Sequence, residues 1–466
     1  MIILLYVMDS LRPDFLSCYG YPKQTSPNID KLAKGGVLFA DAFAQSTWTR
    51  PSGACLLSST YSSVNGVATL DDILSVPVPM LPEVLQTNGF KTIAVSSIGN
   101  ISPYFGLGRG FDHFIELYKE EKVMKKRQTI DLKTFQWDLH FKVQGDYVPI
   151  STSEDLNEFL FPLLEQNRTR DMFIFLWSMD THSPYFHRDP EMTPFYPSQE
   201  IWSPRDVEDM HAEVDRKRFK GLYEDMLYYN DYHIGILMAK LKELDLFEKT
   251  LFILTSDHGE AFGEHGFNAH AREPYDEEIK VPLITKFPGS EFVGKVDGFV
   301  QHIDIFPTIL EYANVSANST SLQGKSFLPL LRDHIETNDF VFSELQITRM
   351  HPSFIALRTR NYKYIAVRPK KETLRQRLKE RKTLWPFHRF THKPIYLFDL
   401  RKDPEERVNI IDREKDLARS FHNRVQTILK ENERIRRSLG KSNEGQEKPI
   451  DKEVAKQLHA LGYFDE

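Results

Sequence analysis

Short apolar runs alternate with amphipathic stretches along the first two thirds of this chain. The apolar runs, each of the length of a buried strand, occupy residues 2–7, 92–95, 172–177, 251–254 and 282–287. Stretches with the apolar spacing of helices lie between them, at residues 27–34, 82–88 and 228–244 among others. This alternation is typical of a mostly parallel sheet that helices cover on both faces. The sequence therefore predicts an α/β fold.

The character of the sequence changes after about residue 331. Short strand-like runs separated by polar turns follow at residues 341–344, 353–359, 362–367 and 395–400. Such a pattern indicates a small antiparallel sheet, and charged, helix-prone segments follow it to the end of the chain. We predict a catalytic α/β domain at residues 1–331 and a C-terminal subdomain at residues 332–466, with a small antiparallel sheet and terminal helices.

Composition and charge exclude several classes of protein. A hydrophobic fraction of 41% with 27% charged residues is ordinary for a soluble globular chain, which argues against disorder and fibrous structure. The formal net charge of -6 gives no reason to expect nucleic acid as a partner. Basic runs at residues 122–127 and 370–382 are interpreted as solvated faces or insertions, and the alternative is a positive rim that attracts an anionic substrate.

The apolar opening of the chain, residues 1–8, is too short to span a bilayer and lacks a basic leader. No later stretch approaches the apolar length that a membrane helix needs, so we expect no membrane anchor. The lack of a signal peptide predicts a cytoplasmic protein. Cys18 and Cys55 are then expected to be free, buried thiols. No sequence feature indicates an oligomeric state.

Polar residues follow three of the predicted strands. Asp9 ends the first apolar run, His182 follows the run at 172–177, and Asp257 with His258 follows the run at 251–254. Because ligands bind at the carboxyl ends of strands in such sheets, these side chains are expected to share one pocket. A buried carboxylate is costly without a cation or another partner. Each residue alone could also be a helix cap or part of a surface turn.

A hydroxyl precedes a proline and a run of small and apolar residues at Thr49-Arg50-Pro51-Ser52-Gly53-Ala54. Free backbone N–H groups at a helix N-terminus favour an anion, so Thr49 is a candidate nucleophile. Taken alone, a Thr49 or Ser46 that merely caps the helix is the simpler interpretation.

Together these pieces resemble the sulfatase family of the alkaline phosphatase superfamily, including its phosphate- and phosphonate-cleaving members. The matches follow one another along nearly the whole chain: Val7-Met8-Asp9-Ser10, Thr49 to Leu57, Gly110-Phe111-Asp112, His182-Ser183-Pro184-Tyr185, Asp257-His258-Gly259-Glu260, Gly263-Glu264-His265-Gly266, Lys280-Val281-Pro282, Asp304-Ile305-Phe306, Tyr362-Lys363-Tyr364, Asp403-Pro404-Glu405 and Leu461-Gly462-Tyr463. Any one match is weak, but the ordered set is specific. The resemblance implies an alkaline phosphatase-like fold, in which helices sandwich a large mostly parallel sheet and a smaller C-terminal antiparallel-sheet subdomain is attached.

The resemblance also implies roles for individual residues. Asp9, Thr49, Asp257 and His258 would bind one divalent cation, with Thr49 as the nucleophile. A threonine hydroxyl is a poor nucleophile at its ordinary pKa, and coordination to a cation is a natural means of activating it. His182 resembles the histidine that contacts the substrate or protonates the leaving group. Contacts with the substrate anion are implied for His265, His270 and Arg272, and more weakly for Lys280 and Asn100. For His265, His270, Arg272 and Lys280, an ordinary surface or core role is an equal alternative.

The implied cation is manganese, calcium, magnesium or zinc. Carboxylate oxygens favour calcium, magnesium or manganese, whereas a histidine ligand favours manganese or zinc.

The sequence also departs from the sulfatase pattern. Sulfatases convert a signature cysteine or serine to formylglycine, and because Thr49 does not fit that pattern, no formylglycine is expected. Gly53 replaces the signature arginine, and Ser10 replaces the second aspartate of the usual pair. These departures favour hydrolysis of phosphate or phosphonate esters, diesters included, through a covalent phospho-threonine. Sulfatase activity, phosphotransfer and a catalytically degenerate binding protein are the alternatives. The expected partner is a small anionic ester, with no nucleic acid or membrane partner.

Overall fold

The computed structural model describes residues 1–126, 129–131, 147–189, 191–196, 213–317, 321–347, 353–368, 395–440 and 450–460. The basic run at 370–382 and the motif Leu461-Gly462-Tyr463 lie outside these residues.

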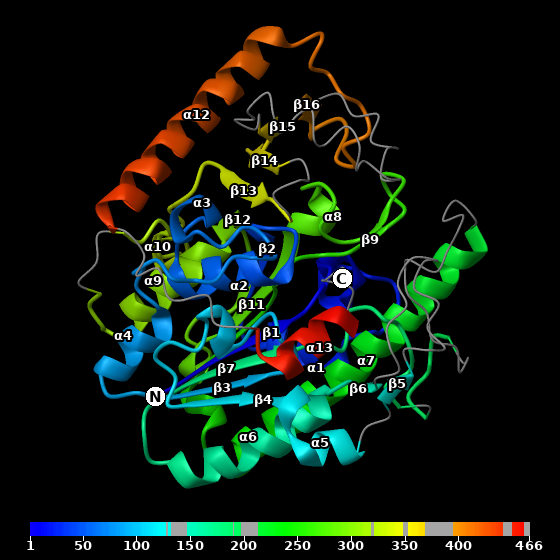
Figure 1. The fold of residues 1–466 in the computed structure, drawn as a ribbon, viewed down its shortest axis with the longest axis vertical. Helices are drawn as coiled ribbons and strands as arrows, with labels where there is room; N and C mark the ends of the chain where they lie inside the picture. The colour runs from blue at the N-terminus through cyan, green and yellow to red at the C-terminus, as the bar shows by residue number, and fades with distance from the viewer. Residues whose placement is uncertain are drawn as a thin grey trace.

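A mostly parallel sheet of eight strands forms the centre of the described chain (Figure 1), in the order β12-β2-β11-β8-β1-β7-β3-β4. Its strands are β1 (Ile2–Met8), β2 (Val37–Phe43), β3 (Lys91–Ser96), β4 (His113–Glu116), β7 (Met172–Ser178), β8 (Thr250–Ser256), β11 (Lys280–Lys286) and β12 (Gly294–Gln301). Within it, β11 runs antiparallel to both of its neighbours, β2 and β8. The α/β fold expected from the alternating pattern is confirmed.

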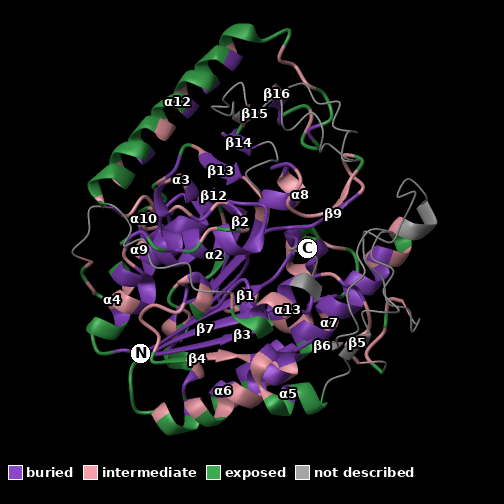
Figure 2. Cartoon of the chain, viewed as in Figure 1, coloured by how far each residue is buried: buried purple, intermediate pink, exposed green. Residues whose placement is uncertain are grey.

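Helices cover both faces of this sheet. In β1, Ile3 and Leu5 belong to one apolar cluster while Ile2 and Leu4 belong to another, because successive side chains of a strand point to opposite faces. The helices in this part of the chain are α1 (Pro27–Lys34), α2 (Thr49–Ser58), α3 (Ser62–Asn65), α4 (Leu81–Thr87), α5 (Glu121–Lys126), α6 (Ser153–Asn167), α7 (Glu213–Glu243), α8 (Asp276–Ile279), α9 (His302–Tyr312) and α10 (Leu328–Asp333). Figure 2 shows the central strands of the main sheet, such as β1 and β7, in the colour of buried residues.

Three strands of the main sheet, β2, β4 and β12, were not predicted from the sequence. β12 reads Gly-Lys-Val-Asp-Gly-Phe-Val-Gln, and its first four residues are partly or fully exposed because it lies at one edge of the sheet. β4 lies at the opposite edge and is likewise only partly buried. Edge strands need only partial apolar character, so they lack the continuous apolar run of the central strands. The helix expected at 228–244 is also longer, since α7 begins at Glu213.

A separate antiparallel sheet lies in the C-terminal part, in the order β13-β14-β15-β16. Its strands are β13 (Val341–Leu345), β14 (Ser353–Arg358), β15 (Tyr362–Arg368) and β16 (Ile395–Asp399), which confirms the small sheet predicted there. Helix α12 (Lys415–Ser438) buries Phe421 and Val425 against one face of it. Helix α13 (Lys452–Ala460) returns to the main domain, where Gln457 donates a hydrogen bond to the carbonyl oxygen of Ser97 (2.8 Å). The domain boundary after residue 331 stays a prediction.

Among the described residues, no helix combines the length and the apolar character that crossing a membrane requires.

Candidate active site

The ends of two neighbouring strands bring the first candidate residues together. β1 pairs with β8 in parallel, with Met8 opposite Ser256, so the next residue of each strand, Asp9 and Asp257, emerges at the same edge. Both side chains and that of His258 are fully buried. One ligand atom from each of Asp9, Asp257 and His258 lies within 4.8 Å of the other two.

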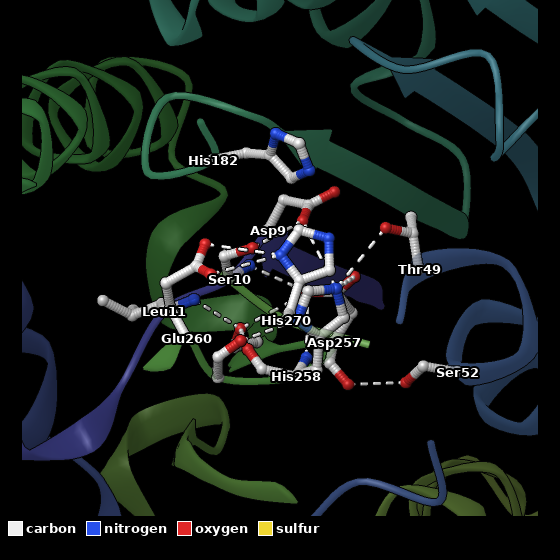
Figure 3. Close-up of polar contacts among 12 residues, drawn as sticks. Asp9, Ser10, Leu11, Thr49, Ser52, His182, Asp257, His258, Glu260 and His270 are labelled. Carbon is white, nitrogen blue, oxygen red and sulfur yellow. Dashed lines mark hydrogen bonds and ion pairs between the residues drawn. The ribbon is translucent and has the colours of Figure 1, made fainter. Parts of the chain in front are cut away.

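Thr49 reaches this cluster from a different element. It is the first residue of α2, whose N-cap is Trp48, so Thr49 does not cap the helix as the simpler interpretation of the sequence had it. Its Oγ1 lies 3.4 Å from Nε2 of His258, and Figure 3 shows the side chain directed at the cluster. The first turn of α2 is tied to the same place, because Ser52 donates a hydrogen bond to the carbonyl oxygen of Asp257 (2.6 Å).

The orientation of His258 is set by a backbone contact. Its Nδ1 lies 2.8 Å from the carbonyl oxygen of Gly259 and must donate, since a carbonyl can only accept. Its Nε2 therefore faces the carboxylates, at 3.1 Å from Oδ2 of Asp257 and 3.7 Å from Oδ1 of Asp9. Burial opposes protonation of the ring, but these carboxylates outweigh it and raise the pKa of His258 to about 10. The two carboxylates therefore favour a positive charge at Nε2 of His258.

Specific hydrogen-bond donors hold the two buried carboxylates in place. Burial and the nearby charge of Asp257 raise the pKa of Asp9 well above its usual value. Trp177 donates from Nε1 to Oδ2 of Asp9 (3.0 Å), and Ser10 donates from Oγ to Oδ1 (3.2 Å). The backbone amide of Ser10 also donates to Oδ1 of Asp257 (3.0 Å). Ser10, which replaces the second aspartate of the sulfatase pair, therefore serves as a donor to both carboxylates.

The side chains of Asp9, Asp257 and His258 suit a divalent cation as ligands. Oδ2 of Asp257 is buried and faces Nε2 of His258 at 3.1 Å. Two carboxylates and an imidazole nitrogen whose other nitrogen is already bonded to a carbonyl form an ordinary ligand set for such an ion. Asp9, Asp257 and His258 would hold it.

Two glycines permit this close arrangement. A Cβ at Gly259 would lie 2.0 Å from the carbonyl oxygen of Glu277, so no larger residue fits between the two segments. A Cβ at Gly53, on α2, would lie 2.5 Å from Cδ1 of Ile101 and 3.4 Å from the ring of Trp177. The space that a signature arginine would need at position 53 is therefore filled by other side chains.

Two further histidines flank the cluster. The ring centroid of His270 lies 4.4 Å from that of His258 and 5.0 Å from that of His182. Burial lowers the pKa of His182 to about 4. Nδ1 of His182 faces the carbonyl oxygen of Ser183, which leaves Nε2 to face the site. The three histidines thus lie close together: His182 follows β7, His258 follows β8, and His270 lies in the segment between β8 and β11 (Figure 3).

Some residues of this site were not predicted from the sequence. Glu260 is fully buried, and its Oε2 lies 3.3 Å from Nδ1 of His270. Burial raises the pKa of Glu260 to about 8. Its place in the Asp-His-Gly-Glu motif was a signal that could have found it, whereas Trp177 looked only like the last apolar residue of a strand.

Two further candidates for contact with the substrate, Arg272 and Asn100, interact with other side chains of the protein. Arg272 lies near Glu278 and Glu260. Burial lowers the pKa of Arg272, although both acidic residues act to raise it. Asn100 accepts a hydrogen bond through Oδ1 from Nη2 of Arg50 (2.8 Å), which connects it to the residue next to Thr49.

His265 and Lys280 are not brought into the cluster. His265 pairs with Glu277 and stacks on Tyr275, with 3.7 Å between ring centroids. Lys280 pairs with Asp41 (2.8 Å). Both line a cavity of about 690 Å³ between the main domain and the small sheet.

The sequence matches two profiles of known protein families. Residues 2–315 match the sequence profile described as sulfatase. The chain belongs to the sulfatase family. Residues 263–433 of this family member also match the profile described as N-sulphoglucosamine sulphohydrolase, C-terminal.

Two sulfatases are similar in sequence to this sulfatase-family chain. It is 28% identical over 334 residues to iduronate 2-sulfatase of Mus musculus, with 62% of this chain and 59% of the mouse protein covered. It is 25% identical over 435 residues to an ulvan-active sulfatase of Formosa agariphila, with 88% and 75% covered. The match thus spans less than two thirds of the mouse relative.

The fold is similar to that of solved members. The crystal structure of a phosphonate monoester hydrolase of Agrobacterium radiobacter aligns with a TM-score of 0.71 and 18% identity, over 92% of this chain and 95% of the other. At this level of identity the likeness shows that the two proteins share a fold.

Proposed function

We propose that this chain hydrolyses phosphate or phosphonate esters, diesters included, with Thr49 as the nucleophile. One observation carries the proposal: Oγ1 of Thr49 lies 3.4 Å from Nε2 of His258, beside the buried carboxylates of Asp9 and Asp257. A hydroxyl buried among prospective metal ligands at the first turn of a helix is poised to attack an anionic ester.

The roles of the individual residues follow from this arrangement. Asp9, Asp257 and His258 hold the cation, and manganese or zinc suits two carboxylates with an imidazole, while calcium and magnesium remain candidates. When bound, the cation supplies positive charge that lowers the pKa of a neighbouring hydroxyl and offsets charge on the substrate. His270, whose ring centroid lies 4.4 Å from that of His258, contacts the substrate's anionic oxygens.

The reaction proceeds in two displacements. Oγ1 of Thr49 loses its proton to water and forms a bond to phosphorus as the bond from phosphorus to the ester oxygen breaks, and the departing alkoxide takes a proton from His182. A water molecule then attacks phosphorus as the bond to Oγ1 breaks. Oγ1 takes a proton from the attacking water, which regenerates the hydroxyl of Thr49, and His182 regains its proton from the solvent. A formylglycine hydrate can release its product by collapsing to an aldehyde, but a threonine ester cannot, so this second attack by water is required.

Sulfate ester hydrolysis is the second candidate, because the named relatives that match the chain are sulfatases. The same two displacements at sulfur would produce a sulfated threonine. The substrate in either case is a small anionic ester.

A panel of p-nitrophenyl phosphate monoesters, phosphate diesters, phosphonate monoesters and sulfates tests the proposal, with the purified protein supplied in turn with manganese, zinc, calcium and magnesium. We expect release of p-nitrophenol from phosphonate monoesters or phosphate diesters to exceed that from the sulfate. Rapid quenching should trap a phosphoryl group on the peptide that contains Thr49. A preference for the sulfate would favour the second candidate, and an unmodified Thr49 during turnover would contradict both.

A further inference from the structure

The segment that carries His270 has an unusual backbone. Ala269 and Ala271, on either side of His270, both have left-handed conformations, with φ of 65° and 63°. Residues with a Cβ rarely adopt this conformation, and they keep it only where surrounding contacts hold the backbone. The position of His270 therefore depends on whatever anchors the segment around it.

One set of anchors lies within the main domain. The amide of Ala271 donates a hydrogen bond to the carbonyl oxygen of Thr47 (3.0 Å), two residues before the nucleophile. The amides of Arg272 and Glu273 donate to the carboxylate of Glu278, at 3.2 and 3.4 Å. Glu278 is fully buried, and it lies on α8, so the position of His270 is linked to that of this short helix.

The other set of anchors comes from the C-terminal sheet. Asp276, the first residue of α8, accepts from Nζ of Lys363 (2.8 Å) and from Nε of Arg358 (3.0 Å). Its own amide donates to Oε2 of Glu406 (2.7 Å), whose Oε1 lies 2.7 Å from the same Nζ of Lys363. Lys363 lies on β15, Arg358 on β14, and Glu406 follows β16. The small sheet thus surrounds the first residue of α8 with charges.

These charges are deeply buried. The side chain of Lys363 is 0% exposed and that of Glu406 is 1% exposed. Burial opposes ionisation of Asp276, but Arg358 and Lys363 outweigh it and hold its pKa below the usual value. Replacing a buried ion pair by well-packed apolar residues is often neutral for stability, whereas removing one partner leaves an unpaired buried charge. A sheet that only needed to adhere to the main domain would not require them.

We infer that Lys363 and Glu406 are positioning residues of the active site, which act through Asp276 and α8 to hold His270 beside His258. The motifs around them, Tyr362-Lys363-Tyr364 and Asp403-Pro404-Glu405, then serve the site from a different sheet. The expected kinetic effect rests on the proposed function, whereas the expected structural effect does not.

The test compares Lys363→Met with a control, Lys402→Met, in the full chain. Methionine keeps most of the length of lysine and removes the charge, and Lys402 is exposed in the turn after β16. Hydrogen exchange, followed by mass spectrometry, is measured on the peptide that contains Ala271, Arg272 and Glu273. We expect exchange there to quicken about tenfold or more in Lys363→Met and to stay unchanged in Lys402→Met, because the anchored amides open more often.

Kinetics give the second readout. In Lys363→Met we expect kcat to fall about tenfold or more while the bound metal stays at the wild-type level, because small displacements of a positioned group slow the chemical step. Lys363→Arg, which keeps the charge, should recover part of the loss. Glu406→Gln, which can still accept from the amide of Asp276, is the second variant if Lys363→Met does not fold.

The two ideas fail in different ways. Unchanged exchange at residues 271–273 in a folded Lys363→Met or Glu406→Gln would overturn the positioning role, whatever the activity. Equal quickening across the whole chain would also overturn it, since that is the signature of general destabilisation. If the wild-type protein cleaved no ester of the panel, the proposed function would be wrong. The hydrogen-exchange comparison would still decide whether Lys363 and Glu406 position the segment around His270.

Discussion

Oγ1 of Thr49 and Nε2 of His258 lie 3.4 Å apart although 209 residues separate them in the sequence. The first residue begins α2 and the second follows β8, so their contact depends on how a helix is seated at the edge of the central sheet. The carboxylates of Asp9 and Asp257 complete the cluster (Figure 3). A hydroxyl, an imidazole and two carboxylates in one buried space are the elements from which the chemistry proposed above is built.

Replacement of Thr49 tests the nucleophile. We expect Thr49→Ala to lower kcat by at least about 10³-fold, because the attacking oxygen is lost while the cation ligands remain. Thr49→Ser, which keeps a hydroxyl, should stay within about tenfold to a hundredfold of the wild type. Thr47→Ala is the matched control, since Thr47 is also fully buried and only two residues away. Full activity in a metal-loaded Thr49→Ala would remove the residue from the mechanism.

The metal ligands and their supports should differ in the strength of their effects. Asp257→Asn is expected to lose bound metal and activity together, because it replaces a carboxylate ligand by a neutral amide. Trp177→Phe keeps an aromatic ring but loses the donor to Asp9, and we expect metal affinity to fall about 10- to 100-fold. Elemental analysis and metal titration measure both. Equal metal affinity in Asp257→Asn and the wild type would argue against the site.

The protonation of His182 should appear in the pH dependence for different leaving groups. Its pKa of about 4 lies below the usual value, so the protonated form declines as the pH rises through 4 and falls about tenfold per pH unit above 5. Alkyl esters need a proton for their leaving group more than aryl esters do. The ratio of kcat/KM for alkyl over aryl esters in the free enzyme should therefore decrease from pH 5 to 8. In His182→Ala this ratio should be lower and flat, and a pH-dependent ratio in that variant would point to another acid.

Gly259→Ala should disrupt both stability and metal binding. The added Cβ would lie 2.0 Å from the carbonyl oxygen of Glu277, and backbone must move to admit it. We expect the free energy of unfolding to fall by about 3 kcal/mol or more, since overpacking against rigid backbone exceeds the usual cost. Gly35→Ala is the control, because its Cβ would meet neighbours at 3.7 Å or beyond. Denaturant unfolding with similar midpoints for the two variants would contradict this account.

The cysteines should be inert in the folded protein. Burial raises the pKa of Cys55 to about 12 and also raises that of Cys18, so few thiolates form at neutral pH. Because the thiolate is the reactive form, we expect iodoacetamide at pH 8 to leave Cys55 unmodified until the chain is denatured. Intact-mass measurement follows the reaction. Rapid modification of native Cys55 would show that its surroundings open readily.

Much of the fold could be predicted from the residues because the central strands are apolar on both faces. The runs at 2–7 and 172–177 differ from β1 and β7 by a single residue at one end. β12 escaped prediction because an edge strand exposes half its length and carries glycine and charged residues. The four strands of the small sheet were found because each is a short apolar run between polar turns.

The sequence by itself determined the chemistry available to this protein: two aspartates and a histidine at strand ends, a threonine in place of cysteine or serine, and family membership. Tertiary structure alone decided which of the other candidates reach the site. It brought His270 within 4.4 Å of His258, and it paired His265 with Glu277 and Lys280 with Asp41 beside a different cavity. The physical reason is that backbone direction between β8 and β11, set by two left-handed alanines and by ion pairs from the small sheet, determines where each side chain points.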